Sequence, residues 1–175
     1  MNTMMIPLLL LTLGNPALAE DSPFVLIDTT LPASPKTTPT PVVDRSDAPP
    51  AVPLAEQMLS AWHPQDLPSA DEWAQVTDAV PALLWLAGHA VLNRDRQRAL
   101  SALRHFDHPD AKHTLFAKAL DSALPELIRL GALDGLRGQH LTPPMCAQLA
   151  TALQDQSALI TKAVHRVTTG QACSK

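Results

Sequence analysis

From Leu54 onward, apolar residues recur every three or four positions, which is the periodicity of amphipathic helices. No alternation of apolar and polar residues is long enough to indicate a strand. The pattern therefore predicts an all-α fold. Pro81, Pro125 and Pro143 stand where a first helical turn tolerates proline, and Gly138 stands where a helix can end. The expected helices cover residues 52–62, 70–78, 80–92, 94–106, 110–121, 124–137, 142–154 and 156–169.

Two of these helices repeat at a common offset. Ala99–Leu103 aligns with Ala132–Leu136, 33 positions later. Phe116–Leu120 aligns with Leu149–Leu153 at the same distance. A weaker copy begins at Ala163, 31 positions after Ala132. One helix pair cannot bury its apolar face alone, so repeated pairs stack into a continuous core.

The repeat predicts about three antiparallel helix pairs, near residues 81–106, 110–137 and 142–169. Small residues would let neighbouring helices approach closely, and leucines would fill the seam between them. The predicted seam residues are Leu100, Leu103, Leu133 and Leu136.

Three segments resemble a known family of helical repeats. They are the turn Asp107–Ala111, the helix Arg98–Leu103 and the stretch Leu130–Leu133. Together they resemble the HEAT-like (armadillo-type) α-solenoid family over about half the chain. The resemblance implies a short right-handed stack of helix pairs over residues 80–175, with an N-terminal helical cap at 54–79. An irregular helical bundle is the alternative.

The cap region holds an unusual share of the tryptophans. Trp62 and Trp73 lie in it, and Trp85 follows in the first expected pair. Terminal repeats are usually atypical because they must cover the core. We therefore interpret the three tryptophans as an aromatic cap; an aromatic platform for a sugar or peptide is the alternative.

The N-terminus has the layout of a secretory signal. An apolar run from Ile6 to Leu13 is followed by Ala17-Leu18-Ala19, a small-x-small pattern that a signal peptidase reads. We expect residues 1–19 to be a signal peptide cleaved after Ala19. The mature protein would then be soluble and periplasmic or secreted.

Residues 20–53 read as a disordered Pro/Thr-rich linker. They contain eight of the 17 prolines, which oppose both helix and central strand. Within them Phe24–Ile27 is an apolar, β-prone tetrad. It is either a sticky remnant near the cleavage site, a strand on this protein's own domain, or a docking peptide for a partner, with Phe24 and Leu26 as contacts.

Charge changes the functional picture. The net charge of −4 and a pI near 5.9 argue against nucleic-acid binding, and no run of 18 apolar residues could span a bilayer. Residues 54–93 contain no Lys or Arg, whereas Arg94, Arg96 and Arg98 crowd a helix start, where the helix dipole disfavours cations. They pair with the acidic cap, form a solvated face, or form a surface for an anionic partner.

Cys146 and Cys173 are the two cysteines, and an even number in an oxidising compartment favours one disulfide. Antiparallel hairpin geometry would bring both to one side of the last pair. The bridge would close a loop of about 28 residues and stabilise the fold by about 3 kcal/mol.

Candidate chemistry is sparse. His105, His108 and His113 lie close to Asp107 and Asp110, so they are candidate zinc or copper ligands, although they span a helix end and a turn. No nucleophile and base are spaced for catalysis, and no cofactor motif occurs.

We therefore expect a protein-binding module for an envelope partner rather than an enzyme. It would act as an accessory subunit of an envelope assembly or would neutralise a toxin. The alternative is a metal-handling protein using residues 105–113.

Overall fold

The computed structural model describes residues 43–60, 67–154 and 156–173. Every described residue belongs to one compact unit of the chain. The predicted signal peptide, the segment with Phe24 and Leu26, and Trp62 lie outside the described residues. Within the described ranges the fold is all-α and contains no strand, as the periodicity predicts.

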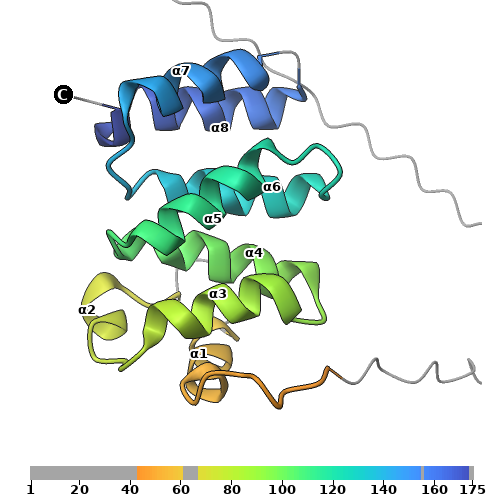
Figure 1. Ribbon diagram of the computed structural model, residues 1–175, viewed down its shortest axis with the longest axis vertical. Helices are drawn as coiled ribbons and strands as arrows, with labels where there is room; N and C mark the ends of the chain where they lie inside the picture. The colour runs from red at the N-terminus through yellow and green to blue at the C-terminus, as the bar shows by residue number, and fades with distance from the viewer. Residues whose placement is uncertain (1–42, 61–66, 155, 174–175) are drawn as a thin grey trace, which may run out of the picture. The chain divides into compact units, whose positions relative to one another are not determined.

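Eight α-helices and two short 3-10 helices form the described part of this unit (Figure 1). Each predicted helix has a counterpart, with ends that differ by a few residues. None of these helices is both long enough and apolar enough to cross a membrane. The helices are α1 (Val52–Leu59), α2 (Ala70–Trp73), α3 (Ala79–His89), α4 (Asn93–Ala102), η2 (Leu103–His105), α5 (Pro109–Leu120), α6 (Glu126–Leu136), α7 (Pro143–Ala152), α8 (Ala158–Thr168) and η3 (Gln171–Cys173).

The extent predicted for the helix at 70–78 is wrong, because α2 ends at Trp73. A capping box fixes its start: Ser69 N–H donates to Glu72 at 2.8 Å, and the Ser69 hydroxyl oxygen accepts from Glu72 N–H at 3.4 Å. Asp78 then adopts a left-handed conformation with φ of 58°, which no α-helix continues through. The chain therefore turns between α2 and α3.

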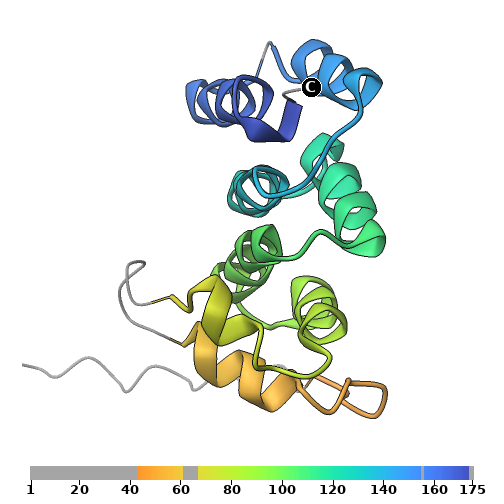
Figure 2. The ribbon, with the colours of Figure 1, turned by 90° about the vertical axis from the view of Figure 1, so that its left-hand side faces the viewer.

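Successive helices form antiparallel pairs: α3 with α4, α5 with α6, and α7 with α8 (Figure 1). Viewed from the side, α4, α6 and α8 make one layer and α3, α5 and α7 the other (Figure 2). In the first layer α6 packs against both α4 and α8. At the other end of this unit, α1 packs on α3 and α4.

The 33-residue offset has a counterpart in the packing. The apolar positions that the offset equates in α4 and α6 are buried, and Val164 and Val167 of α8 continue that series 31 positions further on. The 33-residue alignment of 116–120 with 149–153 is not matched by burial, because the buried residues there are Leu115 and Ala119 in one copy and Leu149 and Leu153 in the other. The four predicted seam residues are fully buried: Leu100, Leu103, Leu133 and Leu136. The periodicity therefore identified the core between α4 and α6 correctly.

A disulfide joins Cys146 in α7 to Cys173 in η3, with their Cα atoms 6.1 Å apart. The predicted bridge is confirmed. Close by, the backbone N–H of Leu141 donates to the carbonyl of Ala172 at 2.8 Å. Both contacts hold the segment after α8 against the start of α7.

Candidate functional site

A pocket of about 340 Å³ lies where α1, the end of α3 and the start of α4 meet. Its volume falls in the range of pockets that hold small ligands or single anchoring side chains. We call it the α1–α3 pocket. Its apolar walls are formed by Val43, Leu59, Leu86, Val91 and Leu92.

The turn between α3 and α4 forms the lip of this pocket. The Nε of Arg96 donates to the carbonyl of Ala90 at 2.6 Å, so a side chain of α4 holds the turn in place. Val91 is 42% exposed and Leu92 52% exposed beside the opening. Two large apolar side chains are thus kept at the surface by a charge-assisted hydrogen bond.

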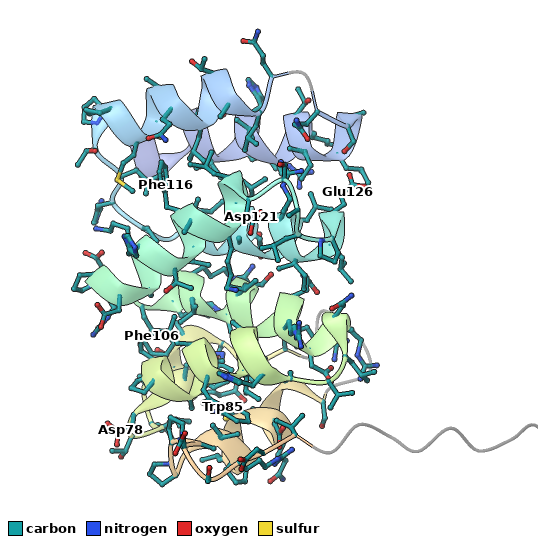
Figure 3. All side chains as sticks on the ribbon, turned by 45° about the vertical axis from the view of Figure 1, so that its right-hand side comes forward. Asp78, Trp85, Phe106, Phe116, Asp121 and Glu126 are labelled. Atoms are coloured by element: carbon teal, nitrogen blue, oxygen red, sulfur yellow. A yellow bond between two sulfur atoms is a disulfide. The ribbon has the colours of Figure 1, made fainter. Side chains whose placement is uncertain are left out.

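Trp85 and His89 form a flat part of the pocket wall. Their rings stack with centroids 4.7 Å apart and planes 18° apart. His89 Nδ1 lies 2.9 Å from the carbonyl oxygen of Trp85, so Nδ1 carries the hydrogen of this bond. Trp85 lies on α3, next to α1 (Figure 3). Trp85 and His89, four positions apart on α3, thus form one continuous surface.

Most polar groups around the pocket already have partners. Arg45 makes a two-pronged ion pair with Glu56, both contacts at 2.9 Å. The Ser60 hydroxyl donates to the carbonyl of Gln57 at 2.7 Å. Arg94 donates through Nε to Asp95 at 3.1 Å. Among the described residues, the Nη groups of Arg94 and Nε2 of His89 make no further hydrogen bond.

The three predicted partner-binding arginines have different surroundings. Arg94 lines the pocket, and its side chain is 51% exposed. Arg96 is half-buried and holds the α3–α4 turn. Arg98 is only 7% exposed and donates to the carbonyl of Leu59 in α1 at 2.7 Å. Of the three, Arg94 presents most of its side chain to a ligand.

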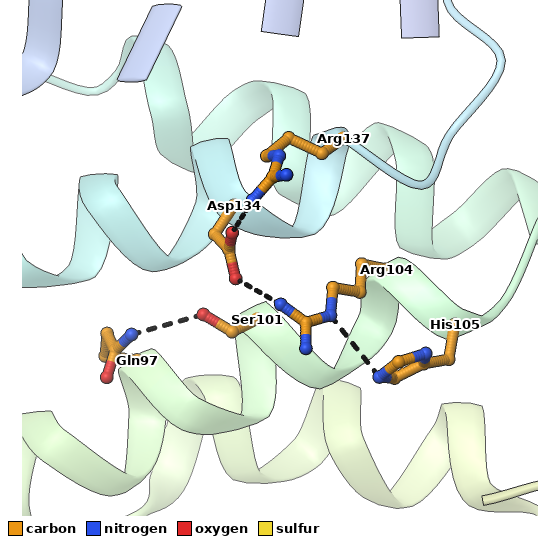
Figure 4. Close-up of polar contacts among 6 residues, drawn as sticks. All are labelled: Gln97, Ser101, Arg104, His105, Asp134 and Arg137. Atoms are coloured by element: carbon orange, nitrogen blue, oxygen red, sulfur yellow. Dashed lines mark hydrogen bonds and ion pairs between the residues drawn. The ribbon is translucent and has the colours of Figure 1, made fainter. Parts of the chain in front are cut away.

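His105 belongs to a polar cluster between η2 and α6 (Figure 4). Arg104 donates to His105 at 3.3 Å and to Asp134 at 3.1 Å, and Arg137 reaches the other carboxylate oxygen of Asp134 at 3.1 Å. Partial burial and the Arg104 charge lower the pKa of His105, and Asp134 opposes this shift. The cluster fastens η2 to α6.

The other histidines of the candidate metal cluster lie apart from this site. Nδ1 of His108 accepts the N–H of Asp110 at 3.2 Å, so His108 caps α5. His113 is exposed on α5, and Asp107 pairs with Lys112 at 3.4 Å. In residues 43–60, 67–154 and 156–173, no three His, Cys, Asp or Glu side chains are grouped so as to hold a metal ion.

The described tryptophans divide between core and surface. Trp73 is 1% exposed and packs edge-on against Phe106, with ring centroids 6.4 Å apart. Within the described part of the chain its indole N–H has no acceptor. Trp85 instead lines the α1–α3 pocket. The tryptophans therefore do not share one role.

Sequence reasoning found Arg94 and Trp85 but did not predict the pocket. Leu59, His89 and Val91 were not among the candidates. The available signal was the adjacent pair Val91-Leu92, which stands directly before the strongly polar helix that begins at Asn93.

The pocket offers recognition chemistry: apolar walls, a flat ring surface and an accessible guanidinium group. Comparison with known protein families, with curated proteins and with solved structures finds no match.

Proposed function

We propose that this protein is an exported helical-repeat module that binds a protein partner in the cell envelope. One observation carries the proposal. Of the five large apolar residues that are strongly exposed in the described ranges, two stand in the turn between α3 and α4 and two are the second residues of α6 and α8. The turn between α3 and α4 and the starts of α6 and α8 lie along one edge of the stack (Figure 1). We call this set the turn edge: Val91, Leu92, Leu127 and Leu159.

Exposed apolar side chains gathered at one edge favour an interaction surface, whereas apolar residues scattered singly over a surface are common. The α1–α3 pocket opens at the same edge, beside Val91 and Leu92. A protein partner would place an anchoring side chain in the pocket and extend along the starts of α6 and α8. The partner could be a subunit of an envelope assembly or a toxin that this protein neutralises.

Export to an oxidising compartment is supported by two independent features. The first 19 residues have the layout of a signal peptide, and the Cys146–Cys173 bridge needs oxidising conditions to persist. Sequencing the N-terminus of the mature protein tests this directly. We expect it to begin at Glu20.

The proposal places the helix pairs in the class of HEAT-like repeats, with a right-handed stack. The successive offsets of 33 and 31 residues between buried positions of α4, α6 and α8 support it. The alternative function, metal handling through His105, His108 and His113, has no such support, because these side chains lie in separate contacts.

Site-specific photo-cross-linking in cells that naturally make this protein tests the proposed function. The cross-linker replaces Leu92 or Leu127 on the turn edge, or Leu54 of α1 as the control, which is 47% exposed. We expect a discrete protein adduct from positions 92 and 127, absent at 54 and lost when Val91 is changed to Asp. Equal adducts at all three positions, or none at the turn edge, would contradict the proposal.

A further inference from the structure

We infer that the α1–α3 pocket binds a peptide segment in which an apolar side chain lies next to a carboxylate group. The inference rests on the proposed function, because it names the chemistry of the partner segment that reaches the turn edge. Three features carry it: the composition of the walls, the pairing of the polar groups that line them, and the unused donors of Arg94 at the mouth.

The walls favour an apolar anchor. Leu59 and Leu86 are 3% and 1% exposed and so belong to the core behind the pocket. Val91 and Leu92 stand at its lip, half exposed. An apolar side chain entering this space would bury its own surface and that of the lip together, which is how anchoring residues contribute to interfaces.

The pairing of the polar groups argues against a sugar or another polyol. Such a ligand needs many hydrogen-bond partners, since each hydroxyl buried without one is unfavourable. Here Arg45 and Glu56 satisfy each other, and Ser60 donates to a backbone carbonyl. The Nη groups of Arg94 and Nε2 of His89 remain unpaired among the described residues, so the pocket suits a ligand with few polar groups better than a polyol.

The donors left unused at the mouth select the nature of the ligand's polar group, since the two arginines and two carboxylates that line the pocket balance in charge. Both Nη atoms of Arg45 donate to Glu56, whereas Arg94 contacts Asp95 only through Nε. The Nη groups of Arg94 thus offer a planar pair of donors, a geometry that matches a carboxylate. With Trp85 as a flat wall, an apolar side chain and an adjacent carboxylate can be held at the same time.

Titration of the full-length, ¹⁵N-labelled protein tests the inference. The first probe pair is N-acetyl-leucine and N-acetyl-leucinamide, which differ in the carboxylate. A second pair, acetyl-Ala-Leu-Asp-amide and acetyl-Ala-Leu-Asn-amide, asks whether a side-chain carboxylate serves as well as a chain terminus. We expect each acid to bind about tenfold more tightly than its neutral partner, as charge-assisted hydrogen bonds predict. The Trp85 indole signal should shift and that of Trp73 should not.

Two variants locate the effect. Arg94→Gln should remove the preference for the acid and leave binding of the amide unchanged. Arg137→Gln is the matched control, because Arg137 is 49% exposed and also pairs with an aspartate, away from the pocket. Ser60→Trp, at an exposed position of the pocket wall, should block both probes. If that variant does not fold, Leu92→Asp replaces it, with Leu54→Asp as its control.

Several results would overturn the inference. These are equal affinity for acid and amide, no shift of the Trp85 signal with any probe, or an unchanged preference in Arg94→Gln. A decanoate affinity more than tenfold above that of the leucine acids would assign the pocket to a lipid amphiphile instead. Since this titration requires no cellular partner, its failure is distinguishable from failure of the cross-linking experiment.

Discussion

A β-carbon on Gly131 would lie 2.7 Å from the backbone carbonyl oxygen of Gln97, so α6 and α4 touch backbone to backbone at this point. Gly135 approaches Leu100, and Gly138, just beyond α6, approaches Arg104 even more closely. The three glycines face three successive turns of the neighbouring segment. The absence of a side chain is what allows α4 and α6, neighbours within one layer, to pack this tightly.

Gly131→Ala should therefore destabilise the fold by about 2 kcal/mol, since the added methyl group meets backbone that must move. Gly88→Ala is the matched control, because Gly88 is also helical but a β-carbon added there would meet no atom within 4 Å. Alanine's higher helix propensity should stabilise that variant by about 0.5–1 kcal/mol. Chemical denaturation of both variants measures the difference. Equal effects would show that close packing at Gly131 does not limit stability.

The core between α4 and α6 was predictable because it depends on local periodicity. Leu100 and Leu133 occupy equivalent places in two copies of one helix, and a single offset relates them. Covalent pairing of Cys146 with Cys173 was also accessible, since only two cysteines exist and both belong to the last helix pair.

The pocket was not predictable for a physical reason: its walls come from segments that no sequence period relates. Arg98 reaches back 39 positions to the carbonyl of Leu59 and thereby places α1 against α4. The pairing of Arg45 with Glu56 then fixes the segment before α1. The sequence indicated that Arg94, Arg96 and Arg98 were unusual, but their separate contacts depend on this tertiary arrangement.

Arg98→Met should destabilise the protein by about 2 kcal/mol, because it removes a buried, charge-assisted hydrogen bond to α1 while keeping the apolar stem. The exposed Arg166 of α8 provides the control substitution, Arg166→Met, for which we expect little change. Urea midpoints of the two variants measure the effect. If they agree with each other, the contact between Arg98 and Leu59 contributes no stability.

Removing the disulfide should lower the free energy of unfolding by about 3 kcal/mol. The unfolded chain then regains the conformational freedom of the loop that the bridge closes between Cys146 and Cys173. We expect the double variant Cys146→Ala, Cys173→Ala to melt at a lower temperature than the oxidised protein. Reductant should lower the melting temperature of the natural chain to a similar value and leave that of the variant unchanged. A melting temperature that is insensitive to reductant would contradict a stabilising role.

Titration of His105 should make the fold less stable in mild acid. Its folded-state pKa is lowered from 6.5 by partial burial and by Arg104, so the unfolded chain binds a proton more readily. Stability should therefore be highest above about pH 6.5 and fall as the pH drops from there toward the folded-state pKa. Hydrogen bonds from Ser46 and Ser69 lower the pKa of Asp44 and of Glu72, so these carboxylates lose their contribution only at lower pH. His105→Gln should flatten the dependence between about pH 7.5 and pH 5, measured by denaturation at each pH. His113→Gln, at an exposed position, is the control and should leave the pH dependence of stability unchanged. Identical pH profiles for the natural chain and His105→Gln would show that the Arg104 cluster does not couple to folding.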